Sequence, residues 1–102
     1  MQYCIYKMRF TWDALKDRTN RRKHGVGFDT AVRVFLDPLH LTRSDQVVEG
    51  EERWQTIGTV AGVLLILVAY AAVDEEEEII RIISARKVTR QERIEYEEAN
   101  QI

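Results

Sequence analysis

The sequence predicts an α+β domain in which helices pack on an antiparallel β-sheet. A basic segment with helix-capping residues lies near the start, apolar segments of strand length follow, and a second capped segment lies near the end. The short connections between the apolar segments favour an antiparallel meander. The chain has 102 residues, so residues 1–102 are expected to form a single domain with one modest core.

The first elements are a short strand and a basic helix. The strand is expected to end at residues 10–12. Asp13 can cap a helix over residues 14–24, because its carboxylate accepts free amide hydrogens of the first turn, and Gly25 supplies a left-handed stop. Leu15 is the only large apolar residue of this helix. No broad apolar stripe holds it, so one face should serve solvent or a partner.

The next segment carries an apolar stripe with helical spacing. Its members are Phe28, Ala31, Val32 and Phe35. The stripe predicts a helix that packs on the sheet, with Asp29 as its cap and Pro38 at its end.

Strands are expected over residues 39–42, 53–60, 63–73 and 79–85. Segment 57–73 is uncharged and reaches the lower length limit of a membrane span. Its glycines and β-branched residues favour a strand end, a tight turn at Ala61–Gly62 and a buried strand. The acidic run 74–78 is interpreted as a solvated hairpin loop, with repulsion of nucleic acid from that edge as the alternative. A final helix through about residue 100 follows a capping box formed by Thr89 and Glu92.

The net charge of −2 hides an uneven distribution. Basic residues outnumber acidic ones in segments 1–43 and 81–93, and an acidic segment separates the two. Local field matters more than net charge for an anionic ligand, so a nucleic-acid partner stays compatible with this chain. The single Cys4 excludes an intramolecular disulfide, and a reduced, cytoplasmic setting is expected.

Arg81 lies inside an apolar strand, where an unpaired arginine is costly to bury. Alternation places it on one face with Ile83 and Ala85. Arg81 must therefore reach solvent, a carboxylate or a ligand. A salt bridge to an acid such as Glu51 or Glu52 and an anion-binding role are both open.

Further arginines gather where the last strand meets the last helix. Arg86, Arg90 and Arg93 lie there, and Tyr96 follows Arg93 at i+3 on the helix. Guanidinium groups can hold phosphate oxygens at two points, and a phenol can stack on a base or move a proton. Each residue alone is more often a surface residue, so the signal is their grouping with the basic first helix.

His24 follows Lys23 at the end of the first helix. It is either a partner of the helix dipole or a general acid or base beside a cation. Trp12 and Trp54 are expected in the core or at its edge. No phosphate-binding loop, nucleophile elbow or metal-ligand cluster is found, so no metal or cofactor is expected.

An ordered set of motifs over residues 9–97 resembles the BrnT family of toxins. The set comprises Phe10-Thr-Trp-Asp13, Lys16, Asn20, Lys23-His-Gly-Val26, Phe28, Ala31, Val34-Phe-Leu-Asp37, Glu51-Glu-Arg-Trp54, Ile57-Gly58, Ile80-Arg-Ile-Ile-Ser-Ala-Arg-Lys87, Glu92-Arg93 and Tyr96. Each motif alone is weak, but the order of the whole set is specific. The chain departs from the family pattern at Ala14, where proline is common, and in its extended acidic loop.

The resemblance implies a RelE-like fold and a bacterial ribonuclease toxin that inhibits translation. It also implies a BrnA-like antitoxin whose ribbon-helix-helix region binds operator DNA, with the toxin in a homodimer or a toxin–antitoxin heterotetramer. In RelE-like toxins the 2′-hydroxyl of the RNA is the nucleophile, so metal-independent chemistry needs cations and modest acid–base groups. The alternatives are a non-catalytic subunit of a DNA-bound repressor complex and a plain RNA-binding domain.

The resemblance also implies which residues form the site. Arg81 and Arg86 are expected to stabilise the phosphate, with Lys23 and His24 contributing charge and proton transfer. Tyr96 is a further catalytic candidate. The expected RNA-binding residues are Arg93, Arg90, Arg22 and Lys16.

Overall fold

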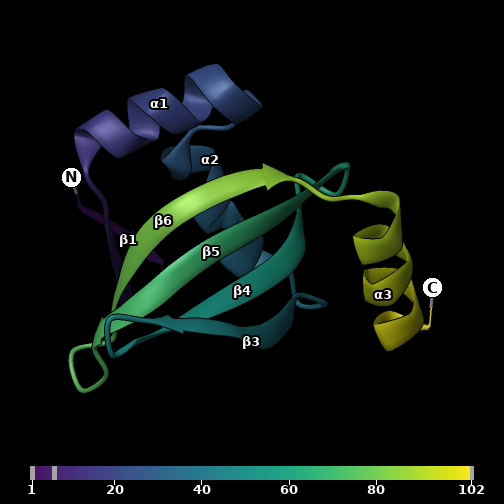
Figure 1. Ribbon diagram of the computed structural model, residues 1–102. Coiled ribbons are helices and arrows are strands. Elements are labelled where there is room, and N and C mark those ends of the chain that lie inside the picture. The colour runs from purple at the N-terminus through teal and green to yellow at the C-terminus, as the bar shows by residue number, and fades with distance from the viewer. Residues whose placement is uncertain (1, 6, 102) are drawn as a thin grey trace.

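A computed structural model describes residues 2–5 and 7–101 of the chain. Within these residues, one six-stranded sheet has the strand order β1-β2-β6-β5-β4-β3, and helices lie beside it (Figure 1). The elements are β1 (Gln2–Ile5), β2 (Met8–Thr11), α1 (Ala14–His24), α2 (Phe28–Ala31), the 3-10 helix η1 (Val32–Leu36), β3 (Leu41–Val48), β4 (Glu51–Val60), β5 (Leu64–Asp74), β6 (Ile79–Lys87) and α3 (Arg90–Asn100). The predicted α+β class is confirmed.

The sheet is mixed, which corrects the expectation of a wholly antiparallel one. Strands β3 to β6 form the predicted antiparallel meander. Strand β2, however, runs parallel to the start of β6, with Arg9 opposite Ile79 and Thr11 opposite Arg81. A parallel neighbour requires a long crossover, and here everything from α1 to β5 lies between the two strands in the sequence.

The ends of α1 agree with the prediction. The Asp13 carboxylate accepts hydrogen bonds from the amides of Leu15 and Lys16 at 2.8 and 3.1 Å. Gly25 follows the helix with a φ of 72°, a left-handed conformation that glycine adopts at no steric cost. The two capping residues therefore define this helix even though it has no apolar stripe.

Polar contacts attach α1 to the sheet. Strand β2 pairs with only the first residues of β6, and α1 runs along β6 (Figure 1). There the Asn20 side chain takes the place of a paired strand, because its Nδ2 donates to the Ala85 carbonyl (2.8 Å) and its Oδ1 accepts from the Ala85 amide (3.2 Å). Asn20 Nδ2 also donates to the Val26 carbonyl at 2.8 Å.

The second helix is shorter than its apolar stripe predicts. One turn of α2 continues as the tighter η1. Gly27 rather than Asp29 is the N-cap, because the Asp29 carboxylate instead accepts from the Thr30 amide (2.9 Å) and forms an ion pair with Arg21 (3.2 Å). The stripe nevertheless packs on the sheet, and Phe28 has no exposed surface.

Strand β5 divides the core between two faces of the sheet. Ile66 and Val68 pack with α2 and η1, whereas Leu65 and Leu67 pack with Tyr96 of α3. We call the first side the α2 face and the second the open face, because α3 covers only one end of it (Figure 1). The open face carries Arg53 and Gln55 of β4 and Arg81, Ser84 and Arg86 of β6.

Two tight turns connect the central strands. The predicted turn at Ala61–Gly62 is confirmed, with φ values of 55° and 71°, and among the residues described no helix is long and apolar enough to cross a membrane. A similar turn at Glu49–Gly50, with φ values of 51° and 79°, joins β3 to β4. Strand β3 therefore extends to Val48, beyond its expected end at Thr42. The acidic run 74–78 is exposed, with Asp74 at the end of β5 and residues 75–78 in the predicted hairpin loop.

Strand β6 departs from strict alternation. Its pairing with β5 shifts between Ser84 and Ile82, which leaves Ile83 as an extra residue. Such a bulge reverses the side on which later residues lie. Ala85 is consequently buried with Ile82 on the α2 face, and the expectation that it shares a face with Arg81 is wrong.

Candidate active site

Two polar rows cross the open face beside the end that α3 covers. The first row consists of Arg53, Ala71 and Arg81. The second row consists of Arg43, Gln55, Ala69 and Ser84. Residues directly opposite one another in paired strands share a face of the sheet. The register therefore brings together charged residues that lie far apart in the sequence.

Two arginines share one carboxylate in the first row. Nη2 of Arg81 donates to Oε1 of Glu51 at 2.6 Å, and Nε of Arg53 lies 3.5 Å from the same oxygen. The hydrogen bond from Arg81 holds the pKa of Glu51 below its usual range. We call these three residues the Glu51 cluster. Its two guanidinium groups and one carboxylate leave one positive charge in excess.

Arg86 is held at two points by Glu92. Its Nη1 and Nη2 donate to the two carboxylate oxygens at 2.7 and 2.9 Å. Oε1 of Glu92 also accepts from the Thr89 amide at 2.8 Å, which completes the predicted capping box. The hydrogen bonds from Arg86 lower the pKa of Glu92 to about 2, and those to Glu92 raise the pKa of Arg86.

Arg43 joins this second group from strand β3. Its Nη1 donates to Glu95 at 2.5 Å, its Nε donates to Gln55 at 3.0 Å, and its Nη2 lies 3.6 Å from Glu92. We call Arg43, Arg86, Glu92 and Glu95 the Glu92 cluster. It lies where α3 begins to cover the open face.

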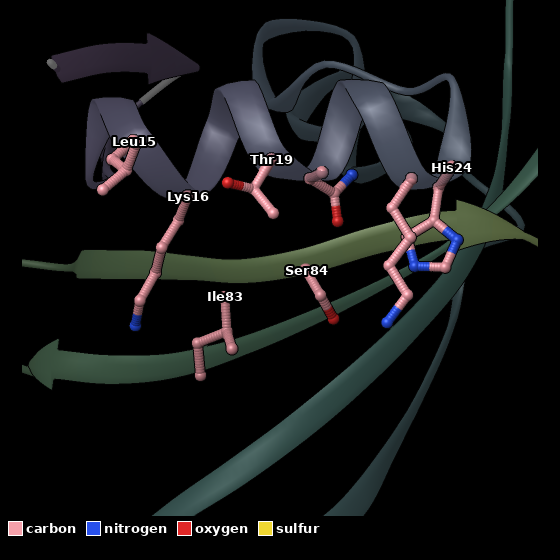
Figure 2. A pocket seen from close by; sticks show the side chains of 8 residues that line it. Leu15, Lys16, Thr19, His24, Ile83 and Ser84 are labelled. Atoms are coloured by element: carbon pink, nitrogen blue, oxygen red, sulfur yellow. The ribbon is translucent and has the colours of Figure 1, made fainter.

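A groove of about 310 Å³ runs between α1 and β6 (Figure 2). Its lining residues are Leu15, Lys16, Thr19, Asn20, Lys23, His24, Ile83 and Ser84. Figure 2 shows the side chains of Lys16 and His24 extending from α1 toward the strand that carries Ser84. None of these described lining residues is acidic. Because Ser84 also belongs to the second polar row, the groove is continuous with the open face.

Tyr96 lies in the packing between α3 and the sheet. It is 4% exposed, and its hydroxyl donates to Oδ2 of Asp37 at 2.6 Å. Burial and this hydrogen bond raise the pKa of Tyr96 to about 12. Burial alone would raise the pKa of Asp37, but hydrogen bonds from Tyr96, Thr59 and the Leu39 amide together hold it below its usual range.

The structure thus brings some predicted site residues together and separates others. Lys16, Lys23 and His24 share the groove. Arg90, Arg93 and Arg22 are exposed on α3 and α1. Arg93 and Tyr96 lie at i and i+3 on α3 as predicted, but the Arg93 side chain is exposed whereas that of Tyr96 is buried.

Arg43 and Arg53 are not among the site residues predicted from the sequence. Strand alternation could have indicated Arg53, since it places Glu51, Arg53 and Gln55 on one face. Arg43 lies in the part of β3 that was not predicted, so only strand pairing reveals its position. Within residues 2–5 and 7–101, no three His, Cys, Asp or Glu side chains are grouped to hold a metal ion.

Comparisons with known proteins point to one family. A family model described as "Ribonuclease toxin, BrnT, of type II toxin-antitoxin system" matches residues 12–92. The 1.1 Å crystal structure of the Brucella abortus ribonuclease toxin, BrnT, is similar, with a TM-score of 0.60 and 27% sequence identity. The similarity covers 79% of this chain and 96% of that one. A comparison with curated proteins gave no match.

Proposed function

The chain belongs to the BrnT family of ribonuclease toxins of type II toxin–antitoxin systems, and from this premise we propose that its groove and open face bind and cleave RNA. The observation that carries the proposal is that the groove and the second polar row share Ser84, so the cationic groove borders the open face that carries the Glu51 and Glu92 clusters. A single-stranded RNA lying across this surface would meet cations along its backbone.

We propose that the nucleophile is the 2′-hydroxyl of the RNA. Its oxygen attacks the adjacent phosphorus, and the bond from phosphorus to the 5′-oxygen of the next nucleotide breaks. A general base takes the proton from the 2′-hydroxyl, and a general acid gives a proton to the leaving oxygen. The products are a 2′,3′-cyclic phosphate and a 5′-hydroxyl. Negative charge accumulates on the phosphorane oxygens, so positioned cations suffice to lower the barrier without a metal ion.

Arg81 and Arg86 are the proposed phosphate ligands. An arginine has five N–H donors. Among the described residues, Arg81 donates one hydrogen bond, to Glu51, whereas Arg86 donates three, one of them to the Lys87 carbonyl. Both guanidinium groups therefore keep donors for phosphate oxygens while the acids fix their orientation.

The groove supplies the remaining functions in this proposal. His24 transfers a proton, Lys23 contributes charge beside it, and Lys16 binds the RNA backbone further along α1. Arg22, Arg90 and Arg93 extend the contact with RNA. The hydroxyl of Tyr96 is committed to Asp37, so we assign Tyr96 to the stability of the fold and leave it out of the catalytic set.

The proposed cellular role is that of a RelE-like toxin. Cleavage of RNA would inhibit translation, and a BrnA-like antitoxin with a ribbon-helix-helix region would neutralise the toxin and contact operator DNA. The toxin would occur as a homodimer or in a heterotetramer with its antitoxin. Induced expression without the antitoxin should arrest growth. Normal growth at full expression would favour a non-catalytic subunit.

The direct test uses purified protein and an end-labelled structured RNA in the presence of a chelator. We expect cleavage by the wild type and strongly reduced cleavage by Arg81→Gln and Arg86→Gln, because each variant removes a cation from the phosphate. Thermal unfolding would show that both variants are folded. Binding of RNA without cleavage by the wild type would favour the RNA-binding alternative.

A further inference from the structure

We propose that Arg53 is a further phosphate-binding residue of this site and that Glu51 is a positioning residue that holds Arg53 and Arg81 toward one phosphodiester. The inference rests on the ribonuclease function proposed above. It assigns a role to an arginine on β4, a strand that none of the sequence-predicted site residues occupies.

The strand register places the two arginines on either side of a small residue. Arg53 pairs with Ala71 across β4 and β5, and Arg81 pairs with Ala71 across β5 and β6. Neighbouring strands lie about 4.8 Å apart, so the two arginine Cα atoms are separated by about 10 Å. Ala71 has no exposed surface. Two long side chains can therefore converge above its methyl group without obstruction from β5.

The contacts of Glu51 show that the two guanidinium groups do converge. Oε1 of Glu51 lies 2.6 Å from Nη2 of Arg81 and 3.5 Å from Nε of Arg53. One anionic oxygen thus already lies between the two cations. A phosphodiester that approached the same two guanidinium groups would meet two positive charges and the one negative charge of Glu51.

Arg53 has unused hydrogen-bonding capacity. Among the described residues, the buried Nε of Arg53 has no hydrogen-bond partner within ordinary geometry and lies 3.5 Å from Oε1 of Glu51 in an ion pair. A buried donor without a partner is costly to the free protein, whereas the side chain as a whole is 25% exposed. The terminal guanidinium nitrogens, which are not among the buried unsatisfied atoms, can donate to a ligand with several acceptor oxygens.

The charge of the Glu51 cluster fits the same ligand. Two arginines and one glutamate leave one positive charge, which equals in size the single negative charge of a phosphodiester. The phosphorane carries additional negative charge, so a second guanidinium group contributes more there than in the ground state. Arg53 is therefore expected to affect the cleavage step as well as binding.

The experiment measures single-turnover cleavage and the affinity for a 2′-O-methyl RNA of the same sequence, which binds but offers no nucleophile. We expect Arg53→Gln to slow cleavage by about 100-fold, in the range for loss of one donor to a transition-state oxyanion. The slope of log Kd against log salt should fall by about 0.7, the value for one phosphate contact with a single strand. A residue with only a structural role would not change this slope.

Two variants control for charge and folding. Arg33→Gln removes an exposed arginine from η1, which packs on the α2 face, and should change neither the cleavage rate nor the slope. Arg53→Lys keeps the charge but loses the two-point contact. It should retain the salt slope and still cleave slowly.

The outcomes separate this inference from the proposed function. If folded Arg53→Gln has the cleavage rate and the salt slope of the wild type, the role of Arg53 is overturned and the proposed ribonuclease function is unaffected. If the wild type does not cleave RNA, the proposed function fails, and an unchanged salt slope in Arg53→Gln would overturn phosphate binding as well. If Arg53→Gln does not fold, wild-type cleavage by folded Arg53→Lys overturns the inference.

Discussion

Arg86 and Glu92 are joined by two nearly equal hydrogen bonds, of 2.7 and 2.9 Å, across the junction of β6 and α3. The same carboxylate accepts from the backbone amide of Thr89, which caps α3. One residue therefore both starts the last helix and orients a proposed phosphate ligand. The position of α3 and the geometry of the site are coupled through this carboxylate.

Replacing Glu92 should therefore weaken the fold. Glu92→Gln loses the charged partner of Arg86 and part of the capping box, and we expect the free energy of unfolding to fall by about 1–3 kcal/mol. Chemical denaturation at pH 7 measures this change. Glu98→Gln is the matched control, because Glu98 is exposed on the same helix. Equal stabilities of the two variants would contradict the role given to Glu92.

The same pair predicts how stability depends on pH. The folded state lowers the pKa of Glu92 from 4.5 to about 2, so folding favours the ionised carboxylate. Its contribution is fully present above pH 4.5 and is lost as the pH falls toward about 2. The stability difference between wild type and Glu92→Gln should narrow over that interval. A difference that stays constant from pH 6 to pH 3 would show that the carboxylate is not stabilised in this way.

Tyr96→Phe tests whether this hydroxyl serves the fold. The variant removes the hydrogen bond to Asp37, and we expect a loss of about 1–3 kcal/mol in the free energy of unfolding at pH 7. The pKa of Tyr96 is raised to about 12, so the contribution of the hydroxyl is present below pH 10 and is lost as the pH rises toward 12. A fully folded Tyr96→Phe protein that no longer cleaves RNA would instead give the hydroxyl a part in the chemistry.

The side-chain amide of Asn20 is expected to hold α1 on β6. In Asn20→Asp, the carbonyls of Val26 and Ala85 lose their donor and a carboxylate is buried in its place. We expect a loss of about 2–4 kcal/mol in the free energy of unfolding. Arg18→Gln, an exposed change on the same helix, serves as control. Wild-type stability of Asn20→Asp would mean that other contacts attach the helix.

Variants of His24 and Lys23, which are neighbours in the groove, should separate effects on RNA binding from effects on the cleavage step. His24→Gln removes the proposed proton-transfer group, and we expect cleavage to slow by about 100-fold or more with little change in the affinity for 2′-O-methyl RNA. Lys23→Gln removes a contact with the RNA backbone and should lower the slope of log Kd against log salt by about 0.7. Identical effects of the two variants on rate and slope would contradict these separate roles.

The parts of the fold that depend on local signals were predictable. Asp13, Gly25 and the capping box of Thr89 and Glu92 each act through a few neighbouring residues, and the structure places the helix ends there. The length of β3 was not predictable from hydropathy, because β3 is an edge strand with mostly exposed side chains. Backbone pairing with β4 holds β3 in place, and no apolar pattern in the sequence indicates that pairing.

The candidate site was predictable only in part for a related reason. Arg81 stood out because a charge inside an apolar strand needs a partner, and the structure supplies Glu51. Arg53 lies among other polar residues and gave no such contrast. Its place beside Arg81 depends on the register across three strands and on the bulge at Ile83. Neither can be read from spacing along one segment.

The most direct test of the central claim replaces a single 2′-hydroxyl. Wild-type protein is incubated in chelator with an RNA and with the same RNA carrying one 2′-deoxynucleotide on the 5′ side of the main cleaved bond. We expect a 2′,3′-cyclic phosphate and a 5′-hydroxyl from the first RNA and no cleavage of that bond in the second, with other sites still cut. Undiminished cleavage at the deoxy position would contradict attack by the 2′-hydroxyl.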